Sequence, residues 1–452
     1  MSEPSAVVHA LDGLLEAADR PAVAAPTVDG PRRWWTGPLD VEGLTIASVG
    51  LALRAAAAVA AARGLTARLD TTTYAAGLAF GSIGHLLVDG HEVPGFAPLS
   101  GFFETADGWI RLHGNYPHHA EALRNELGVH DRSDLSRALL QLPAIETEQR
   151  LRAAGGIAGA LRRPDEWRLS GAGRAVDGAP WISYDTSGAR RRLPPTSGLP
   201  LSGLRVLDLT RVIAGPTGSK LLAALGADVL RIDPPDRPEL LDQHLDTGNG
   251  KRSAIADLRE PTQLESVHAL LVTADALLTS YRPGALVRAG LEGPALRDRH
   301  PHLVHVSLSA WGSDGPWGHE RGFDSIVQSV TGIAHRYGGL DERERWRPGA
   351  LPVQALDHAT GYGVAAATMA LLAVRDEVGA GSASLSLART AHALLDAGAP
   401  PDGPVTTLRP ETVLLDTPHG PVEIGRPPLR IDGVPAEPEA PGGYGAAGLA
   451  WR

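Results

Sequence analysis

One aspartate in this sequence lies where a carboxylate could take part in chemistry. Asp357 belongs to the segment ALDHATG (residues 355–361), which is followed by an alanine-rich run typical of a long helix. A helix N-terminus favours negative charge, so an aspartate there can remain ionised and act as a nucleophile. The same position also suits an aspartate that simply caps the helix. These residues alone favour the cap, so a catalytic role needs support from the rest of the chain.

Other common catalytic patterns are missing from the sequence. It contains no cysteine, which excludes a disulfide framework, a thiolate nucleophile and a cysteine-bearing metal site. His113, His118 and His119 do not form a metal-binding pattern such as HExxH, and we interpret them as part of a surface loop. No GxSxG elbow and no GxxxxGKS/T loop is present. We therefore predict no metal site.

The elements that must position Asp357 start with residues 201–233. Residues 204–209 form a short apolar run, typical of a buried parallel strand. Ala214-Gly215-Pro216 interrupts this run, and Pro216 suits the first turn of a helix, where its missing N–H costs nothing. Residues 220–225 are predicted to carry this helix, with a stop at Gly226. Residues 227–232 are apolar again. This order indicates a strand, a helix and a second, parallel strand.

Such a unit often binds a nicotinamide dinucleotide, but the required glycines are absent here. The dinucleotide fingerprint GxGxxG needs three glycines, with an acid about 20 residues further on. Asp233 is roughly where the acid should be, yet only Gly215 and Gly218 are present. Pro216 also removes an N–H that would face the phosphates. The sequence therefore argues against a redox dinucleotide.

Strands and helices continue to alternate after this unit. This pattern predicts an α/β fold, with a doubly wound, Rossmann-like parallel sheet over about 196–400. The remaining tail, 401–452, is rich in proline and glycine and contains two possible edge strands. The elements expected in the alternating region are strands at 253–258, 276–279 and 303–309, and helices at 264–274, 324–333 and 357–374.

The N-terminal half has a different pattern, which predicts a smaller α+β domain. Residues 46–62 are the most apolar run, and we expect a buried helix there because the run contains Arg54 and is too short to span a bilayer. Residues 101–113 alternate around Asp107-Gly108, which predicts a β-hairpin. Residues 176–200 are rich in glycine, proline and serine. We place a domain boundary there, giving domains 1–195 and 196–452.

The charge balance limits the possible partners. The formal net charge is −10, which argues against nucleic acid or an anionic membrane as the main partner. The N-terminal segment has acidic residues and lacks the basic start and apolar core of a secretory signal. We therefore expect a cytoplasmic protein that acts on small molecules.

The stretch 201–233 resembles the opening of the class III family of CoA transferases, the CaiB/BaiF type that includes formyl-CoA and carnitine-CoA transferases. Further matches follow in the family's order at residues 249–253, 282–284, 290–291 and 305–307. So many ordered matches make a specific signal over about 200–400. The matching residues of the opening stretch are Gly203, Val206, Leu207, Asp208, Thr210, Ala214, Gly215, Pro216, Leu225, Gly226, Ala227, Val229 and Arg231.

The resemblance assigns roles to individual residues. Asp357 matches the family's catalytic aspartate, which implies an acyl-CoA:carboxylate CoA transferase working through an aspartyl-CoA intermediate. Coenzyme A and acyl-CoA would be substrates, with no cofactor bound permanently. The family also implies a homodimer. Residues expected to contact CoA are Arg211, Val212, Ile213, Ala214, Lys251, Arg252 and Arg288.

Two other functions stay open on the sequence. Racemases of this family use a histidine in a Gly-His-Asp segment, and the matching residues here are Gly322-Phe323-Asp324. Phe323 cannot transfer a proton, which argues against an acyl-CoA racemase or isomerase. His358 could substitute, but a histidine at a helix start is usually structural. The third possibility is a CoA-binding subunit without catalysis.

The order of the two halves differs from that of the family. Thr105, Asp107-Gly108-Trp109 and Glu166-Trp167 match the family's small domain, which normally follows the catalytic helix. Here these residues come first, so the order looks permuted, with the joining helix present twice. We expect residues 36–195 to supply the small domain over Asp357, from the same chain or a dimer partner. The counterpart of Asp357 in this half falls at Glu42 or Asp40, where we expect no active site.

Overall fold

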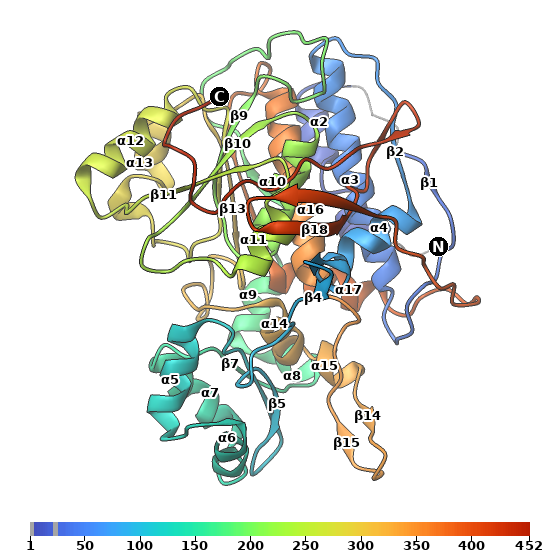
Figure 1. The fold of residues 1–452 in the computed structure, drawn as a ribbon, viewed down its shortest axis with the longest axis vertical. Coiled ribbons are helices and arrows are strands. Elements are labelled where there is room, and N and C mark those ends of the chain that lie inside the picture. The colour runs from blue at the N-terminus through green and yellow to red at the C-terminus, as the bar shows by residue number, and fades with distance from the viewer. Residues whose placement is uncertain (1–3, 21–25) are drawn as a thin grey trace.

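A seven-stranded sheet lies at the centre of residues 4–20 and 26–452, which this computed structural model describes (Figure 1). Its order is β11-β10-β9-β12-β13-β16-β8, and all neighbours are parallel except β16 and β8. This is the order of a doubly wound, Rossmann-like sheet, so the predicted fold class is confirmed. The strands are β8 (Ser183–Asp185), β9 (Arg205–Leu209), β10 (Asp228–Asp233), β11 (Arg252–Ile255), β12 (Ala276–Thr279), β13 (Val304–Ser309) and β16 (Ser382–Ser386).

The predicted strand-helix-strand unit is present, with one difference. β9 and β10 are parallel neighbours, and the connecting helix is α10 (Ala214–Ala224). The helix begins at Ala214, which confirms Pro216 in its first turn, but it starts earlier than the body of the helix expected from Lys220. Pro216 is tolerated there because N–H groups in the first turn have no partner within the helix.

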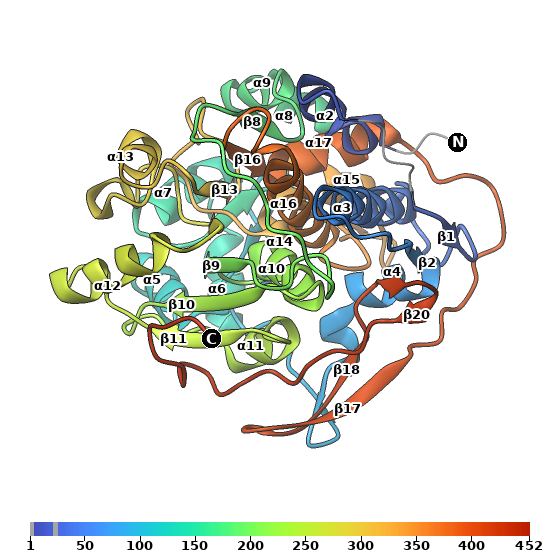
Figure 2. The same cartoon turned by 90° about the horizontal axis from the view of Figure 1, so that it is seen from above.

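Helices cover both faces of the sheet (Figure 2). Leu207 and Leu209 of β9 pack with α12 (Pro261–Leu271) and α13 (Gly293–Arg299) on one face. Val206 packs in the larger core on the other face, because successive strand residues point to opposite sides. That larger core holds α10, α3 (Val41–Ala62) and α16 (Ala355–Val374).

The helices α3 and α16 lie side by side in the core (Figures 1 and 2). Both are rich in alanine, so their backbones can come close together. In the part of the chain that the structure describes, α3 is also the one helix long and apolar enough to cross a membrane. However, 72% of its most apolar window is buried inside the protein. This agrees with the buried helix predicted at residues 46–62.

A small three-stranded sheet lies beyond one end of the main sheet (Figure 1). Its first two strands form the predicted hairpin around Asp107-Gly108, and the third strand pairs with the second. The third strand rests on α14 (Asp324–Thr331) at Gly159, where a Cβ atom would come within 2.9 Å of Ile326 and Val330. Gly159 therefore allows close contact between the two parts. The elements of this small domain are β5 (Gly101–Glu104), β6 (Trp109–Leu112), β7 (Ala158–Ala160), α5 (Pro117–Leu127), α6 (Arg132–Leu139) and α7 (Ala144–Ala153).

The N-terminal half shares its core with the C-terminal half. The predicted boundary at 195/196 falls between β8 and β9, two strands of the same sheet. The buried Arg63, at the end of α3, donates hydrogen bonds to the carbonyls of Pro194, Pro200 and Ser202. These bonds fix the segment that connects the two halves. The division into 1–195 and 196–452 stays a prediction.

The C-terminal tail pairs with strands of the N-terminal half rather than with the main sheet. One four-stranded sheet has the order β1-β2-β19-β20 and another has the order β17-β18-β3-β4. The remaining strands are β1 (Val28–Asp29), β2 (Leu69–Thr72), β3 (Leu87–Val88), β4 (His91–Glu92), β14 (Gly339–Leu340), β15 (Trp346–Arg347), β17 (Thr412–Thr417), β18 (Gly420–Gly425), β19 (Arg430–Ile431) and β20 (Val434–Pro435). The remaining helices are α1 (Ser5–Val8), α2 (Asp12–Ala17), α4 (Thr73–Phe80), η1 (Ser82–His85), α8 (Pro164–Leu169), α9 (Gly171–Asp177), α11 (Leu241–Thr247), η2 (Val287–Ala289), α15 (Ile333–Arg336) and α17 (Leu387–Ala397).

Candidate active site

A cavity of about 270 Å³ opens where the direction of strand addition reverses, at the carboxyl ends of β9, β12 and β13. Doubly wound sheets bind their ligands at this switch point. Its lining combines the loops after these strands with Asp357 of α16 and with Tyr116, His118 and His119 of the small domain. The same chain therefore supplies the small domain at Asp357, which was one of the two arrangements expected.

Asp357 is the third residue of α16 and is buried, with 6% of its surface exposed. It is not the helix cap, because the N-cap position is Gln354. The backbone N–H of Asp357 donates to Oδ2 of Asp324 at 3.0 Å. Among the described residues, no group donates a hydrogen bond to the Asp357 carboxylate. The cap interpretation is therefore wrong.

Burial sets the protonation of Asp357. It raises the pKa of this carboxyl well above its usual range, and the neighbouring Asp324 carboxylate raises it further. The sequence predicted instead that the helix N-terminus would favour the charge. Burial also raises the pKa of Asp324, to about 6, although Gln328 and the Asp357 N–H donate to it. Asp357 is thus a desolvated carboxyl group without a hydrogen-bond donor. Its raised pKa favours the protonated form and makes the ionised form a stronger base and nucleophile.

The loop after β9 reaches the cavity in a strained conformation. Val212 has a φ of 68°, in the left-handed region that a β-branched residue rarely adopts. Its N–H donates to Oε2 of Glu239 at 2.9 Å, and Glu239 also accepts from the Tyr116 hydroxyl and from Arg231. Burial opposes ionisation of Glu239, but Arg231 and Arg211 outweigh it and lower its pKa to about 2. Glu239 therefore holds the strained loop and the small domain together.

The cavity lining contains more cationic than acidic side chains. The acids are Glu320 and Asp357, and the arginines are Arg211, Arg237, Arg282 and Arg321. Burial lowers the pKa of Arg321, the nearby charges of Arg282 and Arg237 lower it further, and Glu320 partly opposes them. A cluster of like charges is costly unless an anion completes it. Guanidinium groups suit phosphates and carboxylates particularly well. The cavity is therefore built to accept an anionic ligand.

The structure brings only some of the predicted CoA contacts to this cavity. Arg211, Val212 and Ala214 line it, whereas Ile213 is buried nearby, outside the lining. Arg288 is exposed on η2, also outside the lining, and its contact with CoA stays a prediction.

Lys251 and Arg252 make internal contacts instead of lining the cavity. Lys251 is buried, and its Nζ donates to Ser219 Oγ at 2.7 Å and pairs with Asp208 at 3.4 Å. Arg252 pairs with Asp228 at 2.8 Å, where β10 and β11 begin, at the opposite edge of the sheet from the cavity. Each neutralises an aspartate of the fold, and their contact with CoA stays a prediction.

The small-domain histidines were misjudged from the sequence. His113 and His119 are buried rather than part of a surface loop, while His118 is exposed. The His113 ring stacks on Phe323 with ring centres 3.9 Å apart, and His119 meets the same ring edge-on at 5.8 Å. In the described residues, no group of side chains is arranged to hold a metal ion. The histidines pack instead around the residue that replaces the racemase histidine.

His358 lies outside the cavity lining, although it follows Asp357 directly. Its ring is buried 5.3 Å from the Phe80 ring, and its Nδ1 is 3.4 Å from the Thr217 hydroxyl. Burial lowers its pKa to about 3. The prediction that His358 is structural agrees with this position.

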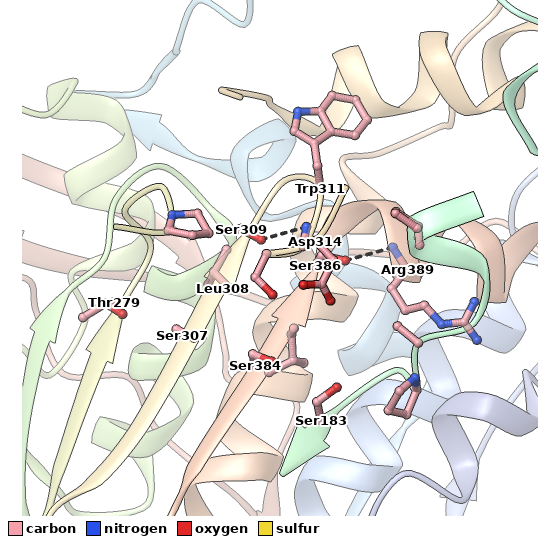
Figure 3. Close-up of a pocket in the computed structure, with 18 of the residues that line it drawn as sticks. Ser183, Thr279, Ser307, Leu308, Ser309, Trp311, Asp314, Ser384, Ser386 and Arg389 are labelled. Carbon is pink, nitrogen blue, oxygen red and sulfur yellow. Dashed lines mark hydrogen bonds between the residues drawn. The ribbon is translucent and has the colours of Figure 1, made fainter. Parts of the chain in front are cut away.

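A second cavity adjoins the first and is lined by hydroxyl groups (Figure 3). Thr279, Ser307, Ser384 and Ser183 are register partners across β12, β13, β16 and β8, so their side chains share one face of the sheet. The two cavities have Tyr281, Leu308 and Ser309 in common. This row of hydroxyls was not recognised in the sequence, because it forms only when four strands align.

Comparisons with known proteins match the region that forms the main cavity. The profile of CoA-transferase family III matches residues 201–402. A probable fatty acyl-CoA transferase of Mycobacterium tuberculosis is 34% identical over 200 residues, which are 41% of this chain and 50% of that protein. The succinate–glutarate CoA-transferase of Agrobacterium fabrum is 32% identical over 197 residues, 39% of this chain and 48% of the relative.

Other matches are similar in extent. The acetyl-CoA:oxalate CoA-transferase of Acetobacter aceti is 34% identical over 153 residues, 31% of this chain and 39% of that protein. A crystal structure of the M. tuberculosis protein matches with a TM-score of 0.40 and 31% identity, covering 44% of this chain and 58% of that one. The chain thus spans about half the length, or less, of these curated relatives.

Proposed function

The chain belongs to CoA-transferase family III through residues 201–402, and from this we propose that it moves coenzyme A from an acyl-CoA donor to a carboxylic acid. Asp357 is the nucleophile of this reaction. The observation that carries the proposal is that Asp357 is buried in a cationic cavity with no hydrogen bond to its carboxylate from the described residues. A carboxylate of this kind is poorly solvated and therefore reactive.

The first half of the reaction has two steps, one at the thioester carbon of the donor and one at the carboxyl carbon of Asp357. An oxygen of Asp357 bonds to the thioester carbon of the donor, the C–S bond breaks, and CoA leaves as the thiolate. The thiolate then attacks the Asp357 carbonyl carbon of the mixed anhydride. The donor acid leaves as its carboxylate, and an aspartyl-CoA thioester remains.

The acceptor acid reverses these steps. Its carboxylate attacks the aspartyl-CoA carbon and releases the thiolate, which then attacks the acceptor carbonyl. The products are a new acyl-CoA and the free Asp357 carboxylate. We assign the phosphates of CoA to the arginines at the cavity, of which Arg237, Arg282 and Arg321 come from three different loops.

Racemisation of the acyl group is a weaker alternative. It requires a second proton-transfer group, and the racemase position is occupied by Phe323, whose ring packs against His113. His358 lies outside the cavity lining. Asp324 already accepts hydrogen bonds from Gln328 and from the Asp357 N–H. These positions favour the transferase.

Mass spectrometry tests the proposal directly. The protein is incubated with acetyl-CoA, succinyl-CoA and a long-chain acyl-CoA in turn, and the peptide containing Asp357 is examined for a CoA adduct. At least one donor is expected to give the adduct, and Asp357→Asn is expected to give none. An adduct on another residue, or exchange of the α-proton of the acyl group without any adduct, would overturn the transferase mechanism.

A further inference from the structure

The small domain brings one buried histidine to the cavity that contains Asp357. His119 is 5% exposed, and its ring lines the cavity. Its Nδ1 has no hydrogen-bond partner among the described residues. Burying a polar nitrogen without a partner is costly, so the His119 side chain, which lines the cavity, is a candidate to bind a ligand.

Four other hydrogen-bond donors of the cavity-lining residues are already occupied. The N–H of Asp357 donates to Asp324, and that of Val212 donates to Glu239. The N–H of Arg211 donates to the Ser280 hydroxyl, and the Tyr116 hydroxyl donates to Glu239. None of these four groups can turn to a ligand without losing its present partner. His119 needs to break no such bond.

The ring of His119 is held in place by its neighbours. It meets Phe323 edge-on, with ring centres 5.8 Å apart, while His113 stacks on the same phenylalanine at 3.9 Å. It is also in contact with His118, at 4.0 Å between ring centres. A donor with a fixed ring needs little reorganisation when charge develops beside it.

The imidazole of His119 is neutral at ordinary pH. Burial lowers its pKa to about 3, and His118, His113, Arg321 and Arg237 around it act in the same direction. A neutral imidazole carries one N–H and is a poor proton acceptor in this setting. It can therefore donate a hydrogen bond without becoming charged.

We propose that the N–H of His119 binds the carbonyl oxygen of the acyl group and stabilises the negative charge that forms there. This inference rests on the proposed function. As an oxygen of Asp357 bonds to the thioester carbon, the C=O electron pair moves onto that oxygen, which accepts the hydrogen bond. The proton stays on His119. When the C–S bond breaks, the electron pair returns and CoA leaves as the thiolate.

Two substitutions separate the donor from the ring. His119→Phe keeps an aromatic ring against Phe323 but removes the N–H, whereas His119→Gln keeps a donor and removes the ring. We expect kcat for CoA transfer to fall by about 10²–10³-fold in His119→Phe, the scale found when one oxyanion donor is removed. KM for acyl-CoA should change by less than about threefold. The kcat of His119→Gln should be at least about tenfold higher than that of His119→Phe.

Further readouts exclude a merely structural role. His130→Phe, at an exposed position of the same domain, is the matched control and should keep the wild-type kcat. Thermal melting should show that both His119 variants remain folded, with His119→Asn as the replacement if His119→Gln does not. Between about pH 5.5 and 8.5 the pH profile should keep its shape in His119→Gln, because a neutral donor does not titrate there.

Clear results would overturn the inference. A folded His119→Phe with kcat within threefold of wild type would show that the N–H is not needed. A His119→Gln variant as slow as His119→Phe would show that the ring, not the donor, matters. The rate of adduct formation on Asp357 in a single turnover separates the two proposals. No adduct in the wild type would reject the function itself, whereas equal rates in wild type and His119→Phe would reject only the role of His119.

Discussion

The helices α3 and α16 begin alike but differ in how their acids are used. In α3, Asp40 accepts from the Gly43 N–H at 2.9 Å and pairs with Arg32 at 2.7 Å. Glu42 accepts from the backbone N–H groups of Trp34 and Trp35 at 2.9 and 2.7 Å. In α16, Asp357 has no such partner among the described residues and lines a cavity.

This difference shows what separates a structural acid from a reactive one. Burial and the alanine-rich context are shared, and Glu42 and Asp357 both lie in the first turn of their helices, so none of these features identifies the chemistry. The distinguishing feature is whether hydrogen bonds satisfy the carboxylate, because a satisfied carboxylate is stabilised and therefore a weak nucleophile. The sequence-based expectation that Asp40 and Glu42 form no active site stays a prediction.

The largest effect is expected at the reactive acid. Asp357→Asn should lower CoA transfer by roughly 10³-fold or more, because an amide cannot form the anhydride. Steady-state rates and the circular dichroism spectrum would be measured together. A folded Asp357→Asn enzyme within tenfold of wild type would show that α16 carries no nucleophile and would remove the contrast with α3.

Substituting the acids at the start of α3 should affect stability rather than activity. The double variant Asp40→Asn, Glu42→Gln should keep most of its activity per folded molecule but lose stability. Breaking a buried ion pair costs about 3–5 kcal/mol, and Arg32 is only partly buried, so we expect a loss near the lower end. Urea unfolding measures this loss, and titrating active molecules normalises the rate. A double variant that folds normally but has no activity would mean that the two halves are misassigned.

The cavity at the start of α16 is lined by arginines, and a third prediction concerns whether these arginines bind CoA. Arg321→Ala should weaken CoA binding by about 1.5–3 kcal/mol, the range for a hydrogen bond to a charged group. Calorimetry with free CoA gives the affinity. Arg299→Ala, at a surface pair with Glu265, is the control and should leave it unchanged. Arg288→Ala in the same assay tests the assignment made from the sequence; unchanged affinity would remove Arg288 from the site.

The smallest effect concerns stability and its dependence on pH. Because the folded-state pKa of Asp357 is raised, its carboxyl favours folding most when protonated, below the usual aspartate pKa of 3.8. That contribution is lost as the pH rises from there through the raised value. Asp357→Asn cannot ionise, so it should melt at a higher temperature than wild type at pH 7 and at about the same temperature at pH 3.5. Calorimetric melts at both pH values check the sign, and a lower melting temperature at pH 7 would contradict it.

The sequence was most informative where the signal is local. The apolar run of β9, the helix stop at Gly226 and the Asp107-Gly108 turn each depend on neighbouring residues, and the corresponding elements are present. Pro216 was placed correctly in the first turn of α10, because a proline there leaves no further backbone group without a partner. The edge strand β8 was missed, since three residues in a glycine- and serine-rich segment carry no clear period.

Residues of the site that depend on distant partners could not be assigned from the sequence. The contact of Lys251 and Arg252 with CoA stays a prediction, but their aspartate partners, 43 and 24 residues away in the chain, could not be predicted. Arg237 and Arg321 join the cavity from loops without a recognisable pattern. Arg321 directly precedes the Gly-Phe-Asp segment that was compared with the racemases, and Arg282 belongs to a matched motif. The positions of Arg321 and Arg282 beside matched segments were therefore the signals that could have assigned them to the cavity.

The bond between Tyr116 and Glu239 has a kinetic consequence, because both residues belong to one covalent chain. Closing the small domain over Asp357 is then a unimolecular event. Its rate depends on the effective concentration set by the connecting chain, not on the concentration of a second molecule. The homodimer implied by the family resemblance stays a prediction, but it is not needed to bring these residues together. Turnover per molecule should therefore not decrease on dilution, as it would if the site were assembled from two chains.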